Sequence, residues 1–396
     1  MNGKQLSDPV VIVAARRTPL GMFQGGLSSS TAPELSATAS AACLEDSGLE
    51  PAAIDEVLIG CVLPAGLGQA PARQAALRAG LSSATPCTTI NKVCGSGMKA
   101  TMSGHDAIVA GSASIVLCGG MESMSNAPYL LPKARGGYRM GHQQVVDHMF
   151  FDGLQNPADG NMMGHFAEAT AEKYGFTREQ QDAFAIESLT RARAAMAEGR
   201  FDDEVAPVTT TTRKGTMEIT EDEGPARADI ERIPHLKAAF RENGTVTAAS
   251  SSSISDGAAS LILMRSSDAE RRGIPVLARI CGHSGFAQEP EWFTTSPVFA
   301  IRALHDMLGW SAKDVDLYEI NEAFAVVTMA AMHDLGIERG KVNVNGGACA
   351  LGHPIGASGA RIVVTLIHAL RAAGGGRGIA SLCIGGGEAT AVGIEV

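Results

Sequence analysis

Short apolar runs alternate with longer segments of helical pattern through the first and last thirds of the chain. We expect buried strands at the apolar runs, because a strand covered on both faces needs no polar side. The predicted strands are 10–15, 56–59, 88–90, 114–118, 277–281, 317–320, 342–344 and 379–383. The predicted helices are 96–110, 300–307, 323–335 and 358–372. This alternation favours an α/β fold with mostly parallel sheets covered by helices.

The middle of the chain has a different pattern. Residues 122–247 carry more charge and more turn residues, with one clear helical stretch at 178–198. We expect 209–212 and 218–225 to be surface loops, and the whole segment to be an insertion into the first half. Its basic residues could together hold a phosphate; they are Lys214, Arg227, Arg232, Lys237 and Arg241.

The two ends of the chain contain matching blocks. Residues 48–55 align with 309–316 at an offset of 261, and residues 91–97 align with 353–359 at an offset of 262. A third block, 117–120, aligns with 382–386 after a small insertion. Because the blocks keep one order and nearly one offset, we interpret the fold as a duplicated unit.

Charge and composition narrow the possible functions. The 396 residues include 32 basic and 42 acidic side chains, a net charge of −10. This balance argues against a partner that is nucleic acid or an anionic membrane. No uninterrupted apolar run approaches the ~18 residues of a membrane span, and residues 1–8 lack the layout of a signal peptide. We therefore predict a cytoplasmic protein.

The cysteine spacing indicates no metal site. None of the eight cysteines forms a C-x-x-C pair, and no H-E-x-x-H motif occurs. A structural zinc site is therefore not expected, and neither are disulfides in the cytosol. Most of these cysteines should be small buried core residues.

Cys94 is the first candidate for chemistry. It follows the predicted strand 88–90 and precedes Gly95, Ser96 and Gly97 at the start of a helix. A lone cysteine is usually an inert core residue, but the positive end of a helix dipole should lower the pKa of this thiol. The free amides of such a turn can also bind an oxyanion.

Three residues at other turns extend this candidate site. His353 lies in the repeat position that matches the Cys94 turn, so the two turns should face each other across a pseudo-twofold axis. Cys383 ends a strand and leads into a glycine run that includes Gly385. Asn321 also follows a strand end, where it either orients a ligand or caps the next helix.

These residues lie in motifs that resemble those of the thiolases. The motifs are NKVCGSG at 91–97, NEAFA at 321–325, GGA at 346–348, GHPIGASG at 352–359 and CIGGG at 383–387. They occur in the family's order and spacing, and the likeness runs from Val10 to the C-terminus. The resemblance implies the thiolase fold, an α/β fold of two duplicated αβαβα-layered halves with an inserted loop domain.

The resemblance also suggests domain boundaries. Residues 1–121 and 248–273 would form the N-terminal half, and 274–396 the C-terminal half. Residues 122–247 would be the inserted domain, which binds coenzyme A (CoA) and carries a tetramer loop at 129–143. The implied assembly is a homotetramer built as a dimer of dimers.

The implied reaction is a Claisen exchange between CoA thioesters. Cys94 would carry the acyl group, His353 would keep Cys94 nucleophilic, and Cys383 would be the acid and base. Asn321 with His353 would form one oxyanion hole, and the amides of Cys94 and Gly385 the other. No metal or redox cofactor is implied, because CoA is itself substrate and product.

The CoA-binding residues carry over from the family less directly. The positions that match the family's pantetheine tunnel are Leu154, Ala248, Ser252, Ala323 and Phe324. Met163 matches a residue of the acyl pocket. Arg227 is the candidate for the nucleotide end, although a gap in the local alignment falls there.

Substrate range stays open at this level. Met162 stands where short-chain biosynthetic thiolases usually have histidine, which favours a more apolar pocket for longer 3-oxoacyl chains, as in a β-oxidation thiolase. Residues 354–358 instead resemble the acetyl-CoA acetyltransferase version. The rival functions are a decarboxylating ketosynthase, against which Cys383 argues, and a non-catalytic acyl-CoA or lipid-binding protein.

Overall fold

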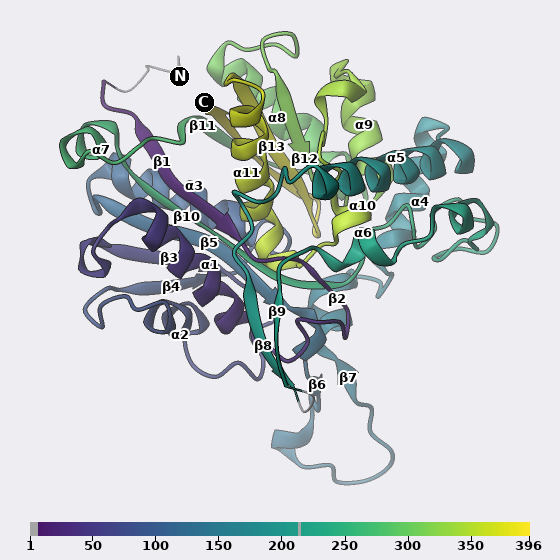
Figure 1. The fold of residues 1–396 in the computed structure, drawn as a ribbon. Coiled ribbons are helices and arrows are strands. Elements are labelled where there is room, and N and C mark those ends of the chain that lie inside the picture. The colour runs from purple at the N-terminus through teal and green to yellow at the C-terminus, as the bar shows by residue number, and fades with distance from the viewer. Residues whose placement is uncertain (1–6, 213–214) are drawn as a thin grey trace.

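The main sheet of the protein runs through both halves of the chain (Figure 1). The computed structural model describes residues 7–212 and 215–396. In this part of the chain the sheet order is β12-β13-β14-β11-β1-β10-β5-β3-β4, and β2 pairs with β10. The strands of the first half are β1 (Val10–Arg17), β2 (Gly21–Met22), β3 (Glu56–Gly60), β4 (Cys87–Ile90), β5 (Ile115–Ser123) and β10 (Ser255–Arg265). Those of the second half are β11 (Ala278–Ala287), β12 (Leu317–Ile320), β13 (Arg377–Ile384) and β14 (Glu388–Glu395).

The strand order is symmetric about the β1–β11 pair, which displays the predicted duplication. Outward from β1 come β10, β5, β3 and β4, and outward from β11 come β14, β13 and β12. The parallel pair β3–β5 corresponds to the parallel pair β12–β13, and the antiparallel pair β5–β10 to the antiparallel pair β13–β14. Two short register pairs, Val11 with Arg279 and Ile12 with Ala278, join the halves.

The expectation of mostly parallel sheets is wrong. Only β3–β4, β3–β5 and β12–β13 are parallel among the strand pairs of the main sheet in the described residues. In each half a returning strand, β10 or β14, runs antiparallel to its neighbours on both sides. Apolar runs show that a strand is buried on both faces, but they carry no information about its direction.

The predicted strand at 342–344 is also wrong. Its place corresponds to β4, yet only an isolated parallel bridge between Tyr318 and Val342 forms there. Asn343 has a positive φ of 48° and turns its side-chain amide onto Ile320. That amide accepts from the Ile320 N–H and donates to the Ile320 carbonyl, both at 2.8 Å. A side chain therefore replaces the main-chain ladder at this edge.

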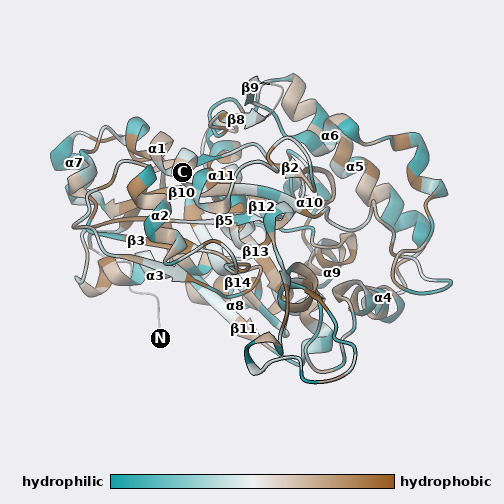
Figure 2. Ribbon diagram, turned by 90° about the horizontal axis from the view of Figure 1, so that it is seen from below, coloured by the Kyte–Doolittle hydropathy of each residue, from teal (hydrophilic) through white to brown (hydrophobic). Residues whose placement is uncertain are grey.

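Helices cover both outer faces of the sheet and fill the space between its halves. The outer helices are α1 (Ala32–Ser47), α2 (Pro71–Arg78) and α7 (Ser266–Arg272) on the first half, and α8 (Ser296–Leu308) and α9 (Ala325–Leu335) on the second. The central helices are α3 (Ser96–Ala110) and α11 (Ile355–Ala372). One apolar cluster lies under each outer layer and a third surrounds the central pair. The arrangement is the predicted αβαβα layering. In Figure 2 the outer helix α7 is mainly hydrophilic.

Glycines allow the two central helices to touch along their first turns. A Cβ atom built on Gly97 of α3 would lie 2.9 Å from the Ala360 nitrogen, and one on Gly359 of α11 would lie 2.5 Å from the Met98 nitrogen. Gly97 and Gly359 are themselves repeat partners at the offset of 262. The helix starts that follow the Cys94 and His353 turns are therefore in contact.

Helix α11 is long and apolar enough by length and composition to cross a membrane. However, 83% of it is buried inside the protein, so it packs as a core helix. The sequence gives no apolar run of that length because small and polar residues interrupt it.

The segment 122–247 contains more regular structure than expected. Its helices are α4 (Met163–Tyr174), α5 (Arg178–Ala197) and α6 (Glu223–Arg227), with a π-helical turn at Met149–Leu154 and 3₁₀ turns at Met124–Asn126, Ala134–Gly136 and Ile230–His235. Its strands are β6 (Tyr129–Leu130), β7 (Val146–Asp147), β8 (Val208–Thr212) and β9 (Gly215–Ile219). The short helix α10 (Ala348–Leu351), by contrast, belongs to the second half and packs on α5 and α6.

Neither predicted surface loop of this segment is a plain loop. β8 and β9 pair as an antiparallel hairpin over 208–219, and α6 covers 223–227. Val208 and Thr210 are buried while Thr209 is exposed, so the threonine run has the two-residue period of a half-buried strand. The chain between β6 and β7 projects away from the body (Figure 1). The predicted domain boundaries stay a prediction.

Candidate active site

Cys94 lies in a tightly bonded turn between β4 and α3. The Asn91 side chain accepts a hydrogen bond from the Val93 N–H at 2.9 Å, and the Ser96 hydroxyl donates to the Val93 carbonyl at 2.6 Å. Val93 has a φ of 47°, a left-handed conformation that is costly for a β-branched residue. The surrounding hydrogen bonds therefore hold the residue before Cys94 in a strained geometry.

The loop after β13 packs directly onto this turn. A Cβ atom on Gly95 would overlap the end of the Ile384 side chain, which would have to move aside. Lys92 forms an ion pair with Glu388 at the start of β14. The Cys94 turn of the first half and the Cys383 turn of the second half are thus side by side, as the duplication predicts.

The Cys94 thiol is neutral in this environment. Burial raises its pKa to about 11, although the backbone amides of Gly385 and of Cys94 itself favour the thiolate, and the Glu122 carboxylate raises the pKa further. The expectation that a helix N-terminus lowers this pKa is wrong in direction, because the desolvation cost exceeds the stabilisation by the amides. The thiol therefore needs a base.

His353 is the candidate for that base. Its Nδ1 lies 2.5 Å from the Ser358 hydroxyl, which itself donates to the Pro354 carbonyl at 3.0 Å. Because the Ser358 hydroxyl gives its proton to the Pro354 carbonyl, it can only accept a hydrogen bond from His353. We therefore place a proton on His353 Nδ1, which donates to Ser358. Nε2 then carries the lone pair, which accepts a hydrogen bond from the Asn321 amide at 3.4 Å. Burial and the nearby Arg361 lower the pKa of His353 to about 3, which keeps the ring neutral.

Asn321 lies beside this lone pair. Its Nδ2 is 3.4 Å from His353 Nε2, and its backbone N–H donates to the Ser381 carbonyl at 3.0 Å. The side-chain oxygen is buried and has no hydrogen-bond partner among the described residues. A buried amide oxygen of this kind is a ready acceptor for a water or ligand donor.

Cys383 is fully buried in an apolar cluster with Ala323, Phe324 and Phe293. Burial raises the pKa of its thiol well above the usual value, and the Cys94 thiol raises it further. Because the two sulfurs act on each other electrostatically, ionising one opposes ionising the other. Deprotonation of Cys383 requires a partner charge within the site.

Glu122 is a site residue that the sequence analysis missed. It is the penultimate residue of β5, is fully buried and acts electrostatically on Cys94. Its carboxylate accepts from the N–H groups of Val62, Leu63 and Gly356 at 3.0, 3.2 and 2.9 Å. Burial raises its pKa to about 7. The sequence offers one signal for Glu122: it is an acidic residue near the end of an otherwise apolar strand.

Five of the seven predicted substrate residues lie around the two turns. Met163 lies 3.5 Å from a Cβ built on Gly385, and Leu154 packs in one apolar cluster with Cys94. The Ser252 N–H donates to the Ala323 carbonyl at 3.0 Å, and the adjacent Phe324 forms a bridge with Ser251. These contacts bring together the segments that carry Leu154, Met163, Ser252, Ala323 and Phe324.

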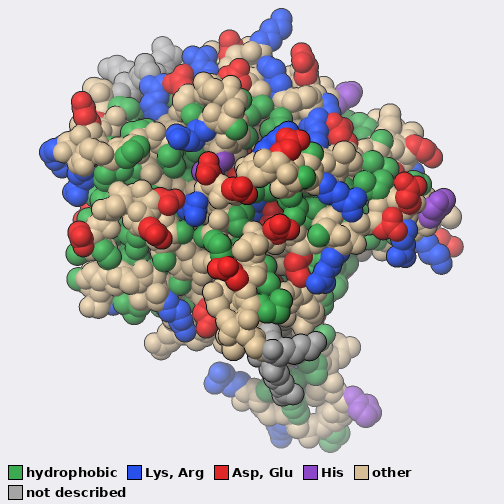
Figure 3. All heavy atoms as spheres, in the orientation of Figure 1, with side chains coloured by type: hydrophobic (Ala, Val, Ile, Leu, Met, Phe, Trp, Pro, Cys, Tyr) green, Lys and Arg blue, Asp and Glu red, His purple; other side chains and the backbone are tan. Residues whose placement is uncertain are grey.

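The other predicted substrate residues lie on the surface. Arg227 is exposed and pairs with Glu223 at 2.9 Å, and Ala248 is exposed. No contact of the described residues joins either of them to the turns. In the predicted basic group, Arg241 pairs with Glu172 at 3.3 Å, and Lys214 lies outside the described residues. Acidic and basic side chains are interspersed over the face shown in Figure 3.

Comparison with known proteins identifies the family. The family model for the thiolase N-terminal domain matches residues 10–267, and that for the thiolase C-terminal domain matches residues 274–396. The chain belongs to the thiolase family. This thiolase is 49% identical to an acetyl-CoA acetyltransferase of Pseudomonas aeruginosa, over 97% of this chain and 98% of that protein. It is 48% identical to acetyl-CoA acetyltransferase 2 of Arabidopsis thaliana, over 98% and 97%.

Solved structures agree with this assignment. The acetyl-CoA acetyltransferase of Bacillus anthracis superposes on this thiolase with a TM-score of 0.96 at 42% identity, covering 98% of both chains. The Acat5 thiolase of Ascaris suum, solved in complex with coenzyme A, has a TM-score of 0.93 at 42% identity, covering 98% of this chain and 99% of that one.

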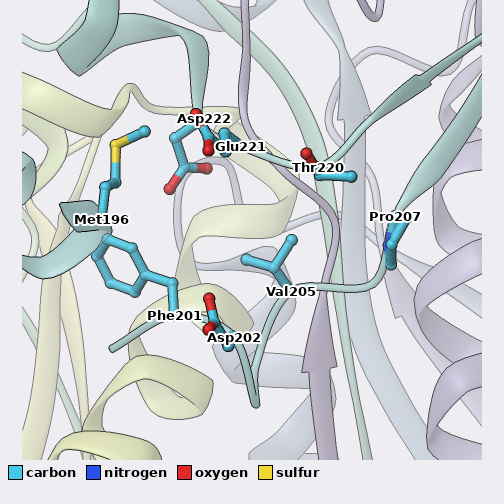
Figure 4. A pocket seen from close by; sticks show the side chains of 8 residues that line it. All are labelled: Met196, Phe201, Asp202, Val205, Pro207, Thr220, Glu221 and Asp222. Carbon is cyan, nitrogen blue, oxygen red and sulfur yellow. The ribbon is translucent and has the colours of Figure 1, made fainter. Parts of the chain in front are cut away.

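One cavity in this thiolase lies apart from the two turns. It measures about 240 Å³ and lies beside the C-terminal end of α5 and the start of α6 (Figure 4). Its lining includes Met196, Phe201 and Asp222, and none of the predicted site residues. Asp222 is committed to a buried ion pair with Arg17 at 2.7 Å. This cavity therefore adds nothing to the catalytic site.

Proposed function

We propose that this thiolase transfers acetyl groups between CoA thioesters, joining two acetyl-CoA into acetoacetyl-CoA and CoA and catalysing the reverse cleavage. The observation that carries the proposal is the meeting of the Cys94 turn with the Cys383 turn, beside a neutral histidine whose Nε2 is unprotonated. The names of the relatives, acetyl-CoA acetyltransferases, support the acetyl group as substrate.

The first half-reaction forms an acyl-enzyme. His353 Nε2 takes the Cys94 proton as the sulfur attacks the thioester carbon of acetyl-CoA. The thiolate and the imidazolium form together, since each charge stabilises the other in a buried site where neither forms alone. The amides of Cys94 and Gly385 hold the tetrahedral oxyanion. The C–S bond to CoA then breaks, and the CoA sulfur takes the proton of Cys383, which remains as a thiolate beside the imidazolium of His353.

The second half-reaction forms a carbon–carbon bond. Cys383, as thiolate, removes a proton from the methyl carbon of a second acetyl-CoA. The enolate oxygen receives hydrogen bonds from His353 and from a donor held at the free Asn321 oxygen. The enolate carbon attacks the Cys94 thioester, and Cys94 leaves as a thiolate that takes the proton held by His353 Nε2. Two sulfurs are needed because one is acylated while the other moves the proton.

The proposal is tested by thiolysis and by mass spectrometry. Purified protein with acetoacetyl-CoA and CoA should consume the enolate absorbance. Cys94→Ser should lose the mass gain of an acyl-enzyme, whereas Cys383→Ser should acylate but fail to condense. No turnover with any 3-oxoacyl-CoA would favour the binding-protein alternative, and unchanged condensation by Cys383→Ser would contradict its role.

Chain length is tested with a series of substrates. Met162 precedes α4, whose first residue Met163 lies against Gly385, so this position borders the acyl end of the site. We propose a preference for the acetyl group in line with the relatives. Rates with C4, C8 and C16 3-oxoacyl-CoA should fall with length; a rate that rises with length would assign the protein to the longer-chain class.

We further propose a homotetramer in the cytoplasm that needs no resident metal or redox cofactor. The projecting β6–β7 segment supports the assembly, because it exposes apolar side chains such as Met140 (91% exposed) and Tyr129 (68%). Exposed apolar residues on a projecting segment are typical of a subunit contact. The two half-reactions move only protons and acyl groups, so they require no redox cofactor. Activity after dialysis against a chelator tests this last point.

A further inference from the structure

Two histidines and an aspartate gather far from the catalytic turns. His105 and Asp106 lie near the end of α3, and His283 lies on β11. At ~1.5 Å per residue, Asp106 is about 15 Å along α3 from the turn that holds Cys94. The His283 Nε2 lies 2.9 Å from the Asp106 Oδ1, and the His105 Nδ1 lies 3.4 Å from the same oxygen.

The geometry of this cluster fits a metal ion. One nitrogen from each ring and one carboxylate oxygen all lie within 4.8 Å of one another. A tetrahedral zinc ion with bonds of ~2.0–2.1 Å holds its ligands about 3.3 Å apart. The two nitrogen–oxygen distances, 2.9 and 3.4 Å, lie within about half an ångström of that value, and the two ring nitrogens are at most 4.8 Å apart.

The chemistry and exposure of the ligands indicate which metal. Two imidazoles with one carboxylate suit Zn²⁺, Co²⁺ or Ni²⁺, whereas Ca²⁺ and Mg²⁺ prefer oxygen ligands throughout. The histidines are nearly buried, with side chains 12% and 18% exposed, while Asp106 is 56% exposed. The rings are fixed edge to face at 5.1 Å between centroids. A fourth position would therefore open to solvent and take water.

We propose that His105, Asp106 and His283 form a binding site for a divalent transition metal, best suited to Zn²⁺. The ligands come from opposite halves of the duplicated fold, so the ion would tie α3 of the first half to β11 of the second. Arg265 lies close enough to act on His105, and its guanidinium is held by the carbonyls of Asp8, Ile108 and Val109. This positive charge should weaken metal binding, so we expect micromolar rather than nanomolar affinity.

The experiment uses Co²⁺ as a visible probe on the full chain without a histidine tag. Accessible thiols are first alkylated with iodoacetamide, which removes Cys94 as a competing ligand. We expect one Co²⁺ per chain, with d–d absorption and no sulfur charge-transfer band, and displacement of the Co²⁺ by Zn²⁺. At a metal concentration of 100 times Kd, the folded-to-unfolded ratio should rise about 100-fold.

Variants localise the site. His283→Ala and His105→Ala should abolish the Co²⁺ spectrum, and Asp106→Asn, an exposed change on a helix that should not disturb folding, should weaken binding at least tenfold. His333→Ala is the matched control, because His333 and Asp334 form a similar adjacent pair at 2.8 Å without a second histidine. It should bind Co²⁺ as the parent does. No binding below millimolar Co²⁺, or full binding by both His283→Ala and Asp106→Asn, would overturn the proposal and leave a hydrogen-bonded triad.

Discussion

Ser358 determines which nitrogen of His353 faces the substrate. Because the hydroxyl accepts from Nδ1, the basic lone pair is directed to Nε2. Ser358→Ala removes that acceptor and lets the proton move to Nε2, which disables the base. We expect kcat to fall roughly 10- to 100-fold, a part of what acid–base catalysis supplies.

A matched variant separates this effect from general loss of stability. Thr365 lies on the same face of α11 and donates its hydroxyl to Glu204 at 3.0 Å, away from His353. Thr365→Ala should lower the unfolding free energy comparably, by about 1–3 kcal/mol, yet keep kcat. Steady-state kinetics and urea unfolding measure the two quantities, and an equal loss of kcat in both variants would count against the assigned tautomer.

The high pKa of Cys94 predicts how the free enzyme reacts with alkylating agents. With a pKa of about 11, the thiolate fraction rises with pH throughout the range from 7 to 10. The rate of iodoacetamide modification should therefore increase about tenfold per pH unit without a plateau. Mass spectrometry of the intact protein follows the reaction, with Cys94→Ala as the blank. A plateau below pH 9 would show that the amides outweigh burial.

Some of these residues could be predicted from the sequence and others could not. Cys94, His353, Asn321 and Cys383 stand at turns between strands and helices, in motifs that are visible in one dimension. Glu122 and Ser358 act through hydrogen bonds to other residues. Glu122 bonds to Val62, 60 residues away along the chain, and Ser358 bonds to His353, five residues away. Nor could the sequence give the pKa of Cys94, because it shows the helix start but not the desolvation.

At the scale of elements, the contact of α3 with α11 depends on glycine. Gly359→Ala would place a Cβ 2.5 Å from the Met98 nitrogen, and backbone cannot move aside cheaply. We expect a loss of about 1–3 kcal/mol of unfolding free energy. Gly104→Ala is the control on α3, since its Cβ would meet only side chains at 3.1 Å or more and gains helix propensity. Urea midpoints should fall for the first and change little for the second.

The buried face of α11 also controls the charge state of the site. Arg361 follows Ser358 by one turn and pairs with Glu319 of β12 at 3.3 Å. Together with burial, its charge lowers the pKa of His353 to about 3, so the proposed base is protonated only in strong acid. Arg361→Met should raise that pKa and move the acid limb of kcat/KM to higher pH.

The conservative variant tests charge separately from packing. Arg361→Lys keeps a cation and should leave the acid limb in place. Both variants disturb a buried ion pair and should lose about 3–5 kcal/mol of unfolding free energy. The pH profile therefore distinguishes the effect of the Arg361 charge from that of its packing. An acid limb that moves equally in both variants would contradict the effect of the charge.

The elements show why the sequence predicts strands better than it predicts the sheet. Seven of the eight predicted strands exist, since apolar runs report burial directly. The eighth failed at Asn343, whose side chain takes the place of a ladder bond, and no hydrophobic pattern encodes that. Most of the antiparallel pairs of the sheet involve β10 or β14, and neither strand was predicted.

On the scale of the whole molecule, duplication explains how the site forms. Each half supplies one turn at a helix start and one loop at a strand end, and the joined sheet places them together. The repeat offset in the sequence was sufficient to predict that the Cys94 and His353 turns meet. It could not predict the inserted hairpin β8–β9, which has no counterpart in the second half.

The projecting β6–β7 segment leads to a prediction about the oligomeric state. Among the described residues, the apolar side chains on this thin projection are exposed, so association with other subunits would remove them from water. Leu131→Glu with Met140→Glu should break the proposed tetramer into smaller species, measured by light scattering after size exclusion. Met217→Glu, which changes an exposed methionine on β9, should keep the parent mass. A tetramer that survives the double change would place the contact elsewhere, and a parent that is smaller than a tetramer would refute the assembly itself.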